Sequence, residues 1–218
     1  MKTSTLIREF VAQAKPGWVF TPSDLAAFGS PYAIGMTLTR MVKAGETDRV
    51  ARGFYNVPAI DPLLGKLAPS AGAVIEALVR RDGVIVRPAG ATAANRLRLT
   101  EQVPAHAVYD TDGASRRIML GRQVLEFRHR AGRALRNASA DSYLLISALG
   151  ELGPVHAQTD RVAHLRGTLS SDARLSLLRD LTYAPAWMRQ SILYVAEAPS
   201  RQSPSAPGLT GTKRRGKQ

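Results

Sequence analysis

Two helix-start signals lie close together near the N-terminus of this sequence, and they constrain its fold more than any other feature. In the first, Thr21 can cap a helix, Pro22 suits its opening position and Asp24 completes a capping-box spacing. The second, Ser30-Pro31, repeats the cap and the proline directly after Phe28-Gly29, where the first helix must end. The sequence therefore predicts two short helices joined by a tight turn.

The segments on either side of these two helices complete a known order of elements. Residues 4–15 place apolar side chains at helical spacing, and residues 18–20 are predicted to be extended. After the helix that begins at Ser30-Pro31, residues 47–50 and 54–57 are predicted to pair as a hairpin. Helix, short strand, helix, turn, helix and hairpin is the order of a winged helix-turn-helix, which we predict for residues 1–60.

The rest of the chain is predicted to follow as an α+β unit, a helical segment and a tail, so the fold class is α+β. Residues 61–65 contain proline and glycine and are interpreted as a linker. The segment after the linker contains both short apolar runs, which predict strands, and apolar residues at helical spacing. The segment after that contains apolar residues at helical spacing only. The predicted boundaries are 66–136 for the basic α+β domain, 137–198 for the helical segment and 199–218 for a disordered basic tail. The predicted elements include strands at 84–86 and 106–109 and helices at 70–81, 88–97, 159–166, 171–181 and 185–197.

Positive charge is the strongest indication of a partner. Thirty Lys and Arg against 17 Asp and Glu give a net charge of +13, which favours nucleic acid or an anionic membrane surface. Segment 66–136 and the tail carry most of the excess, whereas 137–198 is close to neutral. The leucines of segment 137–198 offer more apolar surface than its short helices can bury alone. They must therefore pack on the α+β unit, on a second copy of the chain or on a partner.

Several classes of protein are disfavoured. The N-terminus lacks the apolar run of a signal peptide, and no apolar stretch approaches the length of a membrane span, so a cytoplasmic protein is expected. The chain has no cysteine, which excludes a disulfide framework, a cysteine nucleophile and a thiolate metal site. Asp110 and Asp112 are interpreted as part of a turn, and the histidines show no metal-ligand spacing. We expect no enzyme activity, metal or cofactor.

A winged helix-turn-helix places its third helix in the major groove and its hairpin on the flanking backbone or minor groove. The candidate DNA contacts on the helix are Ser30, Tyr32, Thr37, Arg40 and Lys43, and those on the hairpin are Arg49 and Arg52. Arg128 and Arg130 share one face of a later predicted strand and could hold a second stretch of phosphate backbone. The alternatives are a protein-contact module in the first case and an ordinary solvated strand face in the second.

Several short motifs occur in an order that resembles the AbiEi-type antitoxin family of bacterial abortive-infection systems. The similarity covers roughly residues 5–130. The motifs are Val19–Leu25, Leu38–Gly45, Arg52–Pro58, Pro62–Gly65, Arg81–Gly83, Pro88–Asn95, Gln102–Pro104 and Tyr109–Gly113.

The resemblance implies a repressor that binds double-stranded DNA at its own promoter and counteracts a nucleotidyltransferase-like toxin, often without a stable complex. A homodimer would suit an inverted-repeat operator, because two-fold symmetry matches two half-sites. The alternative function is a protein- or RNA-interaction module that neutralises a toxin without sequence-specific DNA binding.

Overall fold

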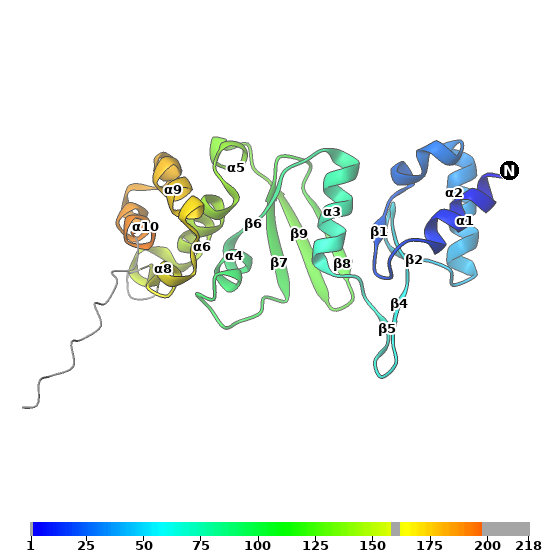
Figure 1. Ribbon diagram of the computed structural model, residues 1–218, viewed down its shortest axis with the longest axis horizontal. Coiled ribbons are helices and arrows are strands. Elements are labelled where there is room, and N and C mark those ends of the chain that lie inside the picture. The colour runs from blue at the N-terminus through cyan, green and yellow to red at the C-terminus, as the bar shows by residue number, and fades with distance from the viewer. Residues whose placement is uncertain (1, 158–161, 198–218) are drawn as a thin grey trace, which may run out of the picture.

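The computed structural model describes residues 2–157 and 162–197, which form a mixed α+β protein with several small sheets. Its elements follow one another along a long axis, with the N-terminal helices at one end and the C-terminal helices at the other (Figure 1). The predicted α+β class is confirmed at this level.

The predicted helix starts near the N-terminus both form. The Thr21 N–H donates to Asp24 Oδ2 at 2.7 Å, and the Ser30 hydroxyl accepts from the Ala33 N–H at 3.3 Å. The first of the two helices is a tighter 3₁₀-helix. In chain order the elements are α1 (Thr3–Ala12), β1 (Val19–Phe20), the 3₁₀-helix η1 (Pro22–Phe28) and α2 (Pro31–Lys43).

A three-stranded sheet closes this N-terminal part. β2 (Asp48–Ala51) and β3 (Phe54–Asn56) form the predicted hairpin, and β1 pairs antiparallel with the other side of β3. Gly53 turns the chain with a φ of +77°, a conformation that costs glycine little. The buried side chains beneath the helices are Ile7, Val11, Phe20, Leu25, Ile34, Leu38 and Met41.

The segment predicted to be a linker is instead a second hairpin, made of β4 (Ala59–Asp61) and β5 (Gly65–Leu67). Asp61 Oδ1 accepts hydrogen bonds from the Leu63 and Leu64 N–H groups at 2.8 and 2.9 Å. Pro62 and Gly65 led us to expect irregular structure here, but the hydrogen bonds to Asp61 give the tip a defined turn. The linker prediction is therefore wrong.

The second unit contains a four-stranded sheet in the order β6-β7-β9-β8, in which β7 and β9 are parallel. Its strands are β6 (Val86–Pro88), β7 (His106–Thr111), β8 (Arg116–Leu120) and β9 (Gln123–His129). Two predictions need correction. The strand expected at 84–86 begins only at Val86, and Asp110 lies inside β7 rather than in a turn, because its neighbours Arg87 and Arg128 pair with it from both sides.

Helix α3 (Ala71–Asp82) packs between the two sheets. Its Val74 and Leu78 share an apolar core with Leu125 and Phe127 of the second sheet and with Phe54 of the first. Arg80 also donates to the Val19 carbonyl at 2.7 Å. The N-terminal part is therefore joined to the second unit by packing as well as by the chain.

The C-terminal helices form a third core, which includes a helix from the second segment. Ala93 and Ala94 of α4 (Gly90–Arg96) are fully buried and belong to the same apolar core as Leu149, Leu177 and Val195. Among residues 2–157 and 162–197, no helix is both long and apolar enough to cross a bilayer. The helices are α5 (Arg133–Asn137), α6 (Ala140–His156), α8 (Leu165–Thr168), α9 (Ser171–Arg179), η2 (Asp180–Tyr183), η3 (Ala186–Met188) and α10 (Arg189–Ala196).

Two predictions concern residues outside the described ranges. The helix expected at 159–166 falls partly on them, and within the described part α8 covers Leu165–Thr168. The tail expected at 199–218 lies wholly outside.

Candidate nucleic-acid interface

One face of α2 is turned away from the N-terminal core. Ile34, Leu38 and Met41 are buried, and the helical period therefore directs Tyr32, Arg40 and Lys43 outward. Tyr32 is 79 % exposed, close to the N-terminus of the helix. Ser30 is also exposed, although its hydroxyl caps the helix.

Thr37, predicted as a contact on this helix, is not on that face. It is 5 % exposed, and its hydroxyl donates to the Ala33 carbonyl at 2.8 Å. It lies three residues after Ile34 and four before Met41, so it occupies the buried stripe. Thr39 is exposed instead, and its hydroxyl donates to the Gly35 carbonyl.

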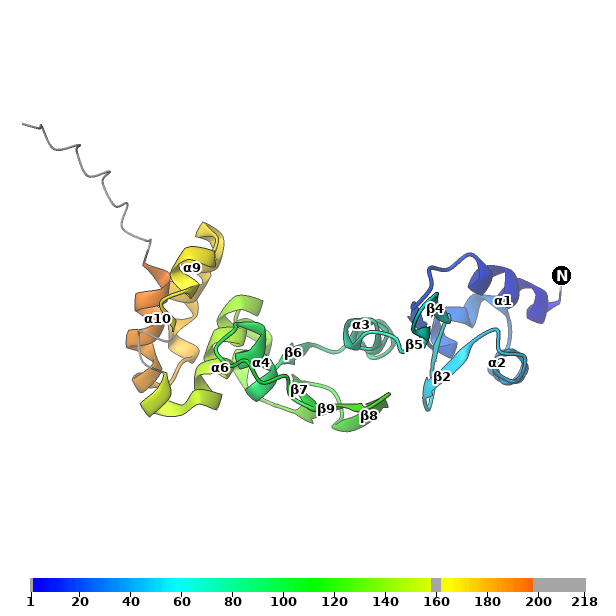
Figure 2. The same cartoon turned by 90° about the horizontal axis from the view of Figure 1, so that it is seen from below.

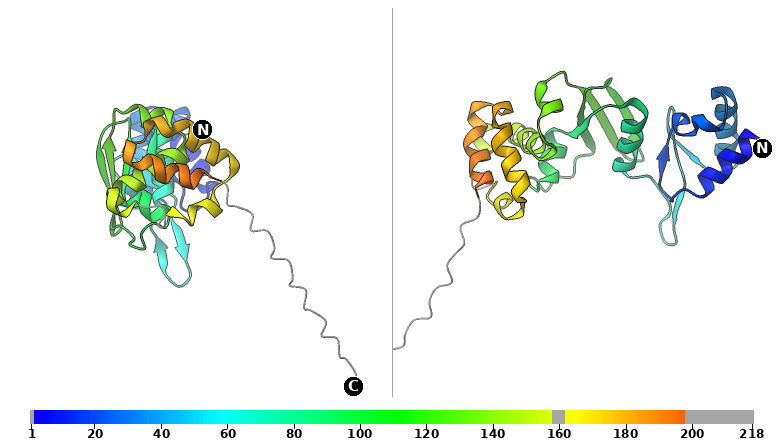
Figure 3. Two further views of the ribbon diagram at one scale, coloured as in Figure 1. Left: turned by 90° about the vertical axis from the view of Figure 1, so that its left-hand side faces the viewer. Right: turned by 45° about the horizontal axis from the view of Figure 1, so that its top comes forward.

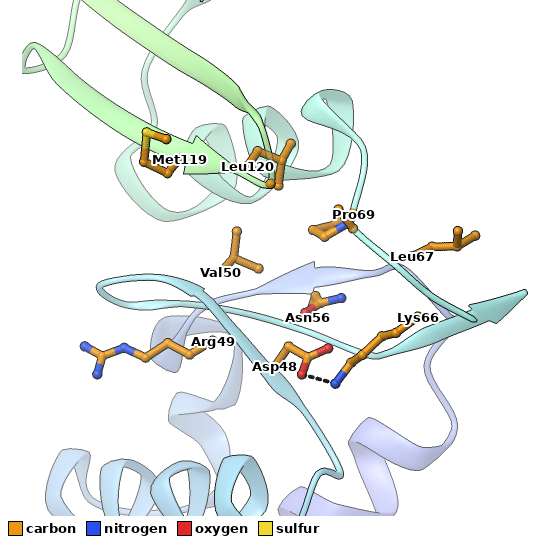
Figure 4. Close-up of a pocket in the computed structure, with 11 residues that line it drawn as sticks. Asp48, Arg49, Val50, Asn56, Lys66, Leu67, Pro69, Met119 and Leu120 are labelled. Carbon is orange, nitrogen blue, oxygen red and sulfur yellow. Dashed lines mark hydrogen bonds and ion pairs between the residues drawn. The ribbon is translucent and has the colours of Figure 1, made fainter. Parts of the chain in front are cut away.

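The β2–β3 hairpin supplies two further cations, Arg49 and Arg52. Both are exposed, Arg49 on β2 and Arg52 in the turn. The Arg49 side chain points away from the neighbouring Asp48–Lys66 ion pair (Figure 4). The hairpin thus presents guanidinium groups at its edge and at its tip.

The four cations Arg40, Lys43, Arg49 and Arg52 share one electrostatic property. None of them has a carboxylate within ion-pair distance in the described part of the chain, whereas Arg8 on α1, for example, pairs with Glu46 at 3.0 Å. Their positive charge is therefore not neutralised by any carboxylate of the residues that the structure describes.

The tip of the β2–β3 hairpin reaches the second sheet. Arg52 lines a hollow of about 340 Å³ together with Arg81, Arg116 and Arg117. Arg81 and Arg116 both bind Asp82, at 2.7 and 2.9 Å. The hydrogen bond from Arg81 is the main reason that the pKa of Asp82 lies below its usual range. Two of the four guanidinium groups that line the hollow therefore share the Asp82 carboxylate.

This arginine cluster could not be found from the sequence, because its members come from the hairpin, from α3 and from β8. Nothing in the sequence predicts that Arg81 lies in this cluster. It lies over the Phe54 ring, 4.4 Å from its centroid, and this contact links the hairpin to α3.

The predicted second contact, Arg128 and Arg130, lies on the exposed face of the sheet, but both residues are paired. Arg128 and Arg117 bind the two oxygens of Glu126 at 3.3 and 3.1 Å, and their hydrogen bonds lower its pKa. Arg130 lies 3.5 Å from the buried Asp110. Arg117 and Arg128 line one hollow of about 390 Å³, next to the hollow that contains Arg52.

In Figure 2, α2, β2 and the β8–β9 pair follow the lower edge of the molecule, and α3 lies on the other face of the sheet. Besides Ser30, seven of the predicted residues are exposed, namely Tyr32, Arg40, Lys43, Arg49, Arg52, Arg128 and Arg130. Of these, Arg52 and Arg128 line neighbouring hollows.

Comparisons with known proteins give a family and one distant structure. The sequence pattern of a family of unknown function (DUF6088) matches residues 6–175. The crystal structure of RV2827C protein from Mycobacterium tuberculosis is similar to 89 % of this chain and 76 % of that chain, with 16 % sequence identity and a TM-score of 0.48. No curated protein matches the chain.

Proposed function

The chain belongs to the DUF6088 family, whose function is unknown, and we propose that it is a DNA-binding repressor and antitoxin. In this proposal residues 1–60 act as a winged helix-turn-helix. Helix α2 enters the major groove, and the β2–β3 hairpin contacts the flanking backbone or minor groove.

The observation that carries the proposal is the set of unpaired cations. Arg40, Lys43, Arg49 and Arg52 are exposed on the helix and the hairpin, and no carboxylate in residues 2–157 and 162–197 lies within ion-pair distance of them. Exposed cations without a partner can bind phosphates and release counterions from DNA. The small residues Ala33, Gly35 and Thr39 leave room for the backbone of α2 to approach a groove.

The second sheet would extend this interface. Arg117 lines one hollow with Arg52 and the neighbouring hollow with Arg128, so a duplex held by the hairpin would pass close to Arg117 first. Arg117 and Arg128 share one carboxylate, Glu126, which leaves a net positive charge on this part of the surface. We assign them to the phosphate backbone, because paired guanidinium groups are poorly placed to discriminate bases.

The test is binding to the promoter upstream of the protein's own gene, compared with a shuffled duplex, over a range of salt concentrations. Arg52→Ala should weaken specific binding by about 1–3 kcal/mol if Arg52 contacts a base, or reduce the salt slope by about 1 if it contacts a phosphate. Arg189→Ala is the matched control, since Arg189 is exposed on α10 at the far end of the molecule. Equal affinity for the two duplexes would overturn the repressor proposal and favour a protein- or RNA-interaction module.

The antitoxin part of the proposal rests on the resemblance of residues 5–130 to AbiEi-type antitoxins. The C-terminal helices offer a surface for a protein partner, because Leu175 and Leu178 of α9 are 65 and 47 % exposed on one side of that helix. Co-expression with a neighbouring nucleotidyltransferase-like toxin separates the two activities. Leu175→Asp should lose rescue and keep promoter binding, whereas Arg52→Ala should do the reverse.

A further inference from the structure

The β4–β5 hairpin presents large apolar side chains to solvent. Ile60, Leu63 and Leu64 are 78, 94 and 78 % exposed, and they cluster around its tip. The hairpin projects beyond the rest of the molecule in the left view of Figure 3. Exposed apolar side chains that form one contiguous patch often indicate a surface that binds a partner.

The tip is held in a fixed position. Two hydrogen bonds from the Leu63 and Leu64 N–H groups to Asp61 organise the turn. At the base, Lys66 of β5 forms an ion pair with Asp48 of β2, which anchors the hairpin to the first sheet. A rigid apolar tip loses little conformational entropy when it binds.

A hollow of about 320 Å³ lies beside the base of the same hairpin. Its lining is about half polar and half apolar and comes from β2, from β5 with the residues after it, and from the end of β8 with the turn that follows (Figure 4). The polar part is supplied by Asp48, Arg49, Asn56 and Lys66. Asn56 is 1 % exposed and has a side-chain oxygen that accepts no hydrogen bond from the described residues. The apolar lining consists of Val50, Leu67, Ala68, Pro69, Met119 and Leu120.

We propose that the hollow receives the hairpin tip of a second copy of this chain. Within the described residues β5 pairs with β4 alone, so its outer edge is free. Two hairpins laid antiparallel along these edges would be related by a two-fold axis, and each tip would reach the base of the other. The contact is then reciprocal and closed, as a symmetric dimer requires.

The charges of the hairpin favour protein over nucleic acid. Asp61 places a carboxylate at the tip, and the ammonium group of Lys66 is already paired with Asp48. A phosphate backbone would meet negative charge and leucine side chains. The hairpin tip carries none of the proposed DNA contacts, but Arg49 lines the hollow as well as belonging to the proposed DNA interface. The dimer can therefore be tested through Leu63 without changing a proposed DNA contact.

The absence of cysteine from the sequence allows a direct test by cross-linking. The full chain carrying Leu63→Cys and Met119→Cys should form a disulfide-linked dimer on mild oxidation, seen on a non-reducing gel. The matched control is the double variant Met119→Cys and Leu175→Cys. Leu175 lies on α9 and is 65 % exposed. A covalent dimer of the first variant but not of the second supports the proposal. Equal linkage, or no linkage, overturns it.

Sedimentation velocity gives a second measurement without cross-links. The wild-type protein should form more dimer as its concentration rises, and Leu63→Asp should weaken dimerisation by about tenfold or more, because a buried leucine would become a buried charge. Leu63 is almost fully exposed in the single chain, so its circular dichroism should not change. A wild-type protein that stays monomeric, or a dimer that Leu175→Asp dissociates and Leu63→Asp does not, would exclude this interface.

Discussion

The Tyr143 hydroxyl donates a hydrogen bond of 2.6 Å to Asp110 Oδ2, and both residues are largely buried. This bond joins α6 to the central strand β7. The other oxygen of Asp110 has no hydrogen-bond partner among the described residues, although Arg130 lies 3.5 Å away. Burial, followed by the hydrogen bond to Asp110, raises the pKa of Tyr143, which therefore remains a donor throughout the physiological range.

The first prediction follows from this bond. Tyr143→Phe should lower the free energy of unfolding by about 1–3 kcal/mol, because the buried carboxylate of Asp110 loses its donor. Urea titration measures the change. Tyr32→Phe is the control, since Tyr32 is 79 % exposed and should not affect stability. Equal stability of the two variants would mean that water replaces the tyrosine hydroxyl.

The second prediction concerns acid stability. Burial alone would raise the pKa of Asp180, but hydrogen bonds from Arg179, the Ser139 N–H and Ser142 outweigh it and lower the pKa to about 2. Because the pKa is lower in the folded state, the stabilisation is fully present above pH 4 and is lost as the pH falls toward 2.

Thermal unfolding measured between about pH 5 and pH 2 detects this loss, because that range includes both the ordinary pKa of an aspartate and the lowered pKa of Asp180. Asp180→Asn should flatten the dependence, because it removes the titrating group while keeping an acceptor. Asp141→Asn, at an exposed position in the first turn of α6, is the comparison. An identical pH dependence in wild type and Asp180→Asn would exclude Asp180 as the source.

The third prediction separates the two threonines of α2. Thr37→Val should leave promoter affinity unchanged, because the Thr37 hydroxyl is buried and bonded to its own helix. Thr39→Val changes an exposed hydroxyl on the proposed DNA face. Fluorescence anisotropy with labelled promoter DNA compares them. A larger loss for Thr37→Val than for Thr39→Val would mean that another face of α2 meets the DNA.

The fourth prediction concerns the second sheet. Glu126→Gln should strengthen DNA binding and steepen its salt dependence, because it frees Arg117 and Arg128 from their shared carboxylate. Glu76→Gln makes the same change of charge at an exposed position on α3, and α3 lies on the other face of the sheet. If both variants gain affinity equally, net charge alone is responsible and the sheet face has no specific role.

Local signals in the sequence were sufficient for the N-terminal helices. The caps at Thr21 and Ser30 act within four residues, so their hydrogen bonds could be predicted without the rest of the chain. The same spacing places Thr37 in the core, since it lies between Ile34 and Met41 on one stripe. Its polar side chain is compatible with this position because the hydroxyl donates to the Ala33 carbonyl of its own helix.

Other features depend on contacts that no local pattern encodes. The β4–β5 hairpin looked like a linker because its apolar side chains show no buried alternation; they face solvent. Arg52 and Arg117 meet only because α3 brings the two sheets together. The positive charge of the region could be predicted from the sequence, but the arrangement of its ion pairs could not.

The position of α4 has a consequence for synthesis of the chain. This helix lies between strands β6 and β7 in the sequence, yet Ala93 and Ala94 are fully buried in the C-terminal core, where α4 packs against the later helix α6. At a synthesis rate of about 5–20 residues per second, α6 leaves the ribosome several seconds after α4. During that interval the alanine-lined face of α4 is open to solvent and to other chains. A polypeptide that stops before α6 keeps this face exposed permanently, which would make it prone to aggregate and a target for chaperones or proteases.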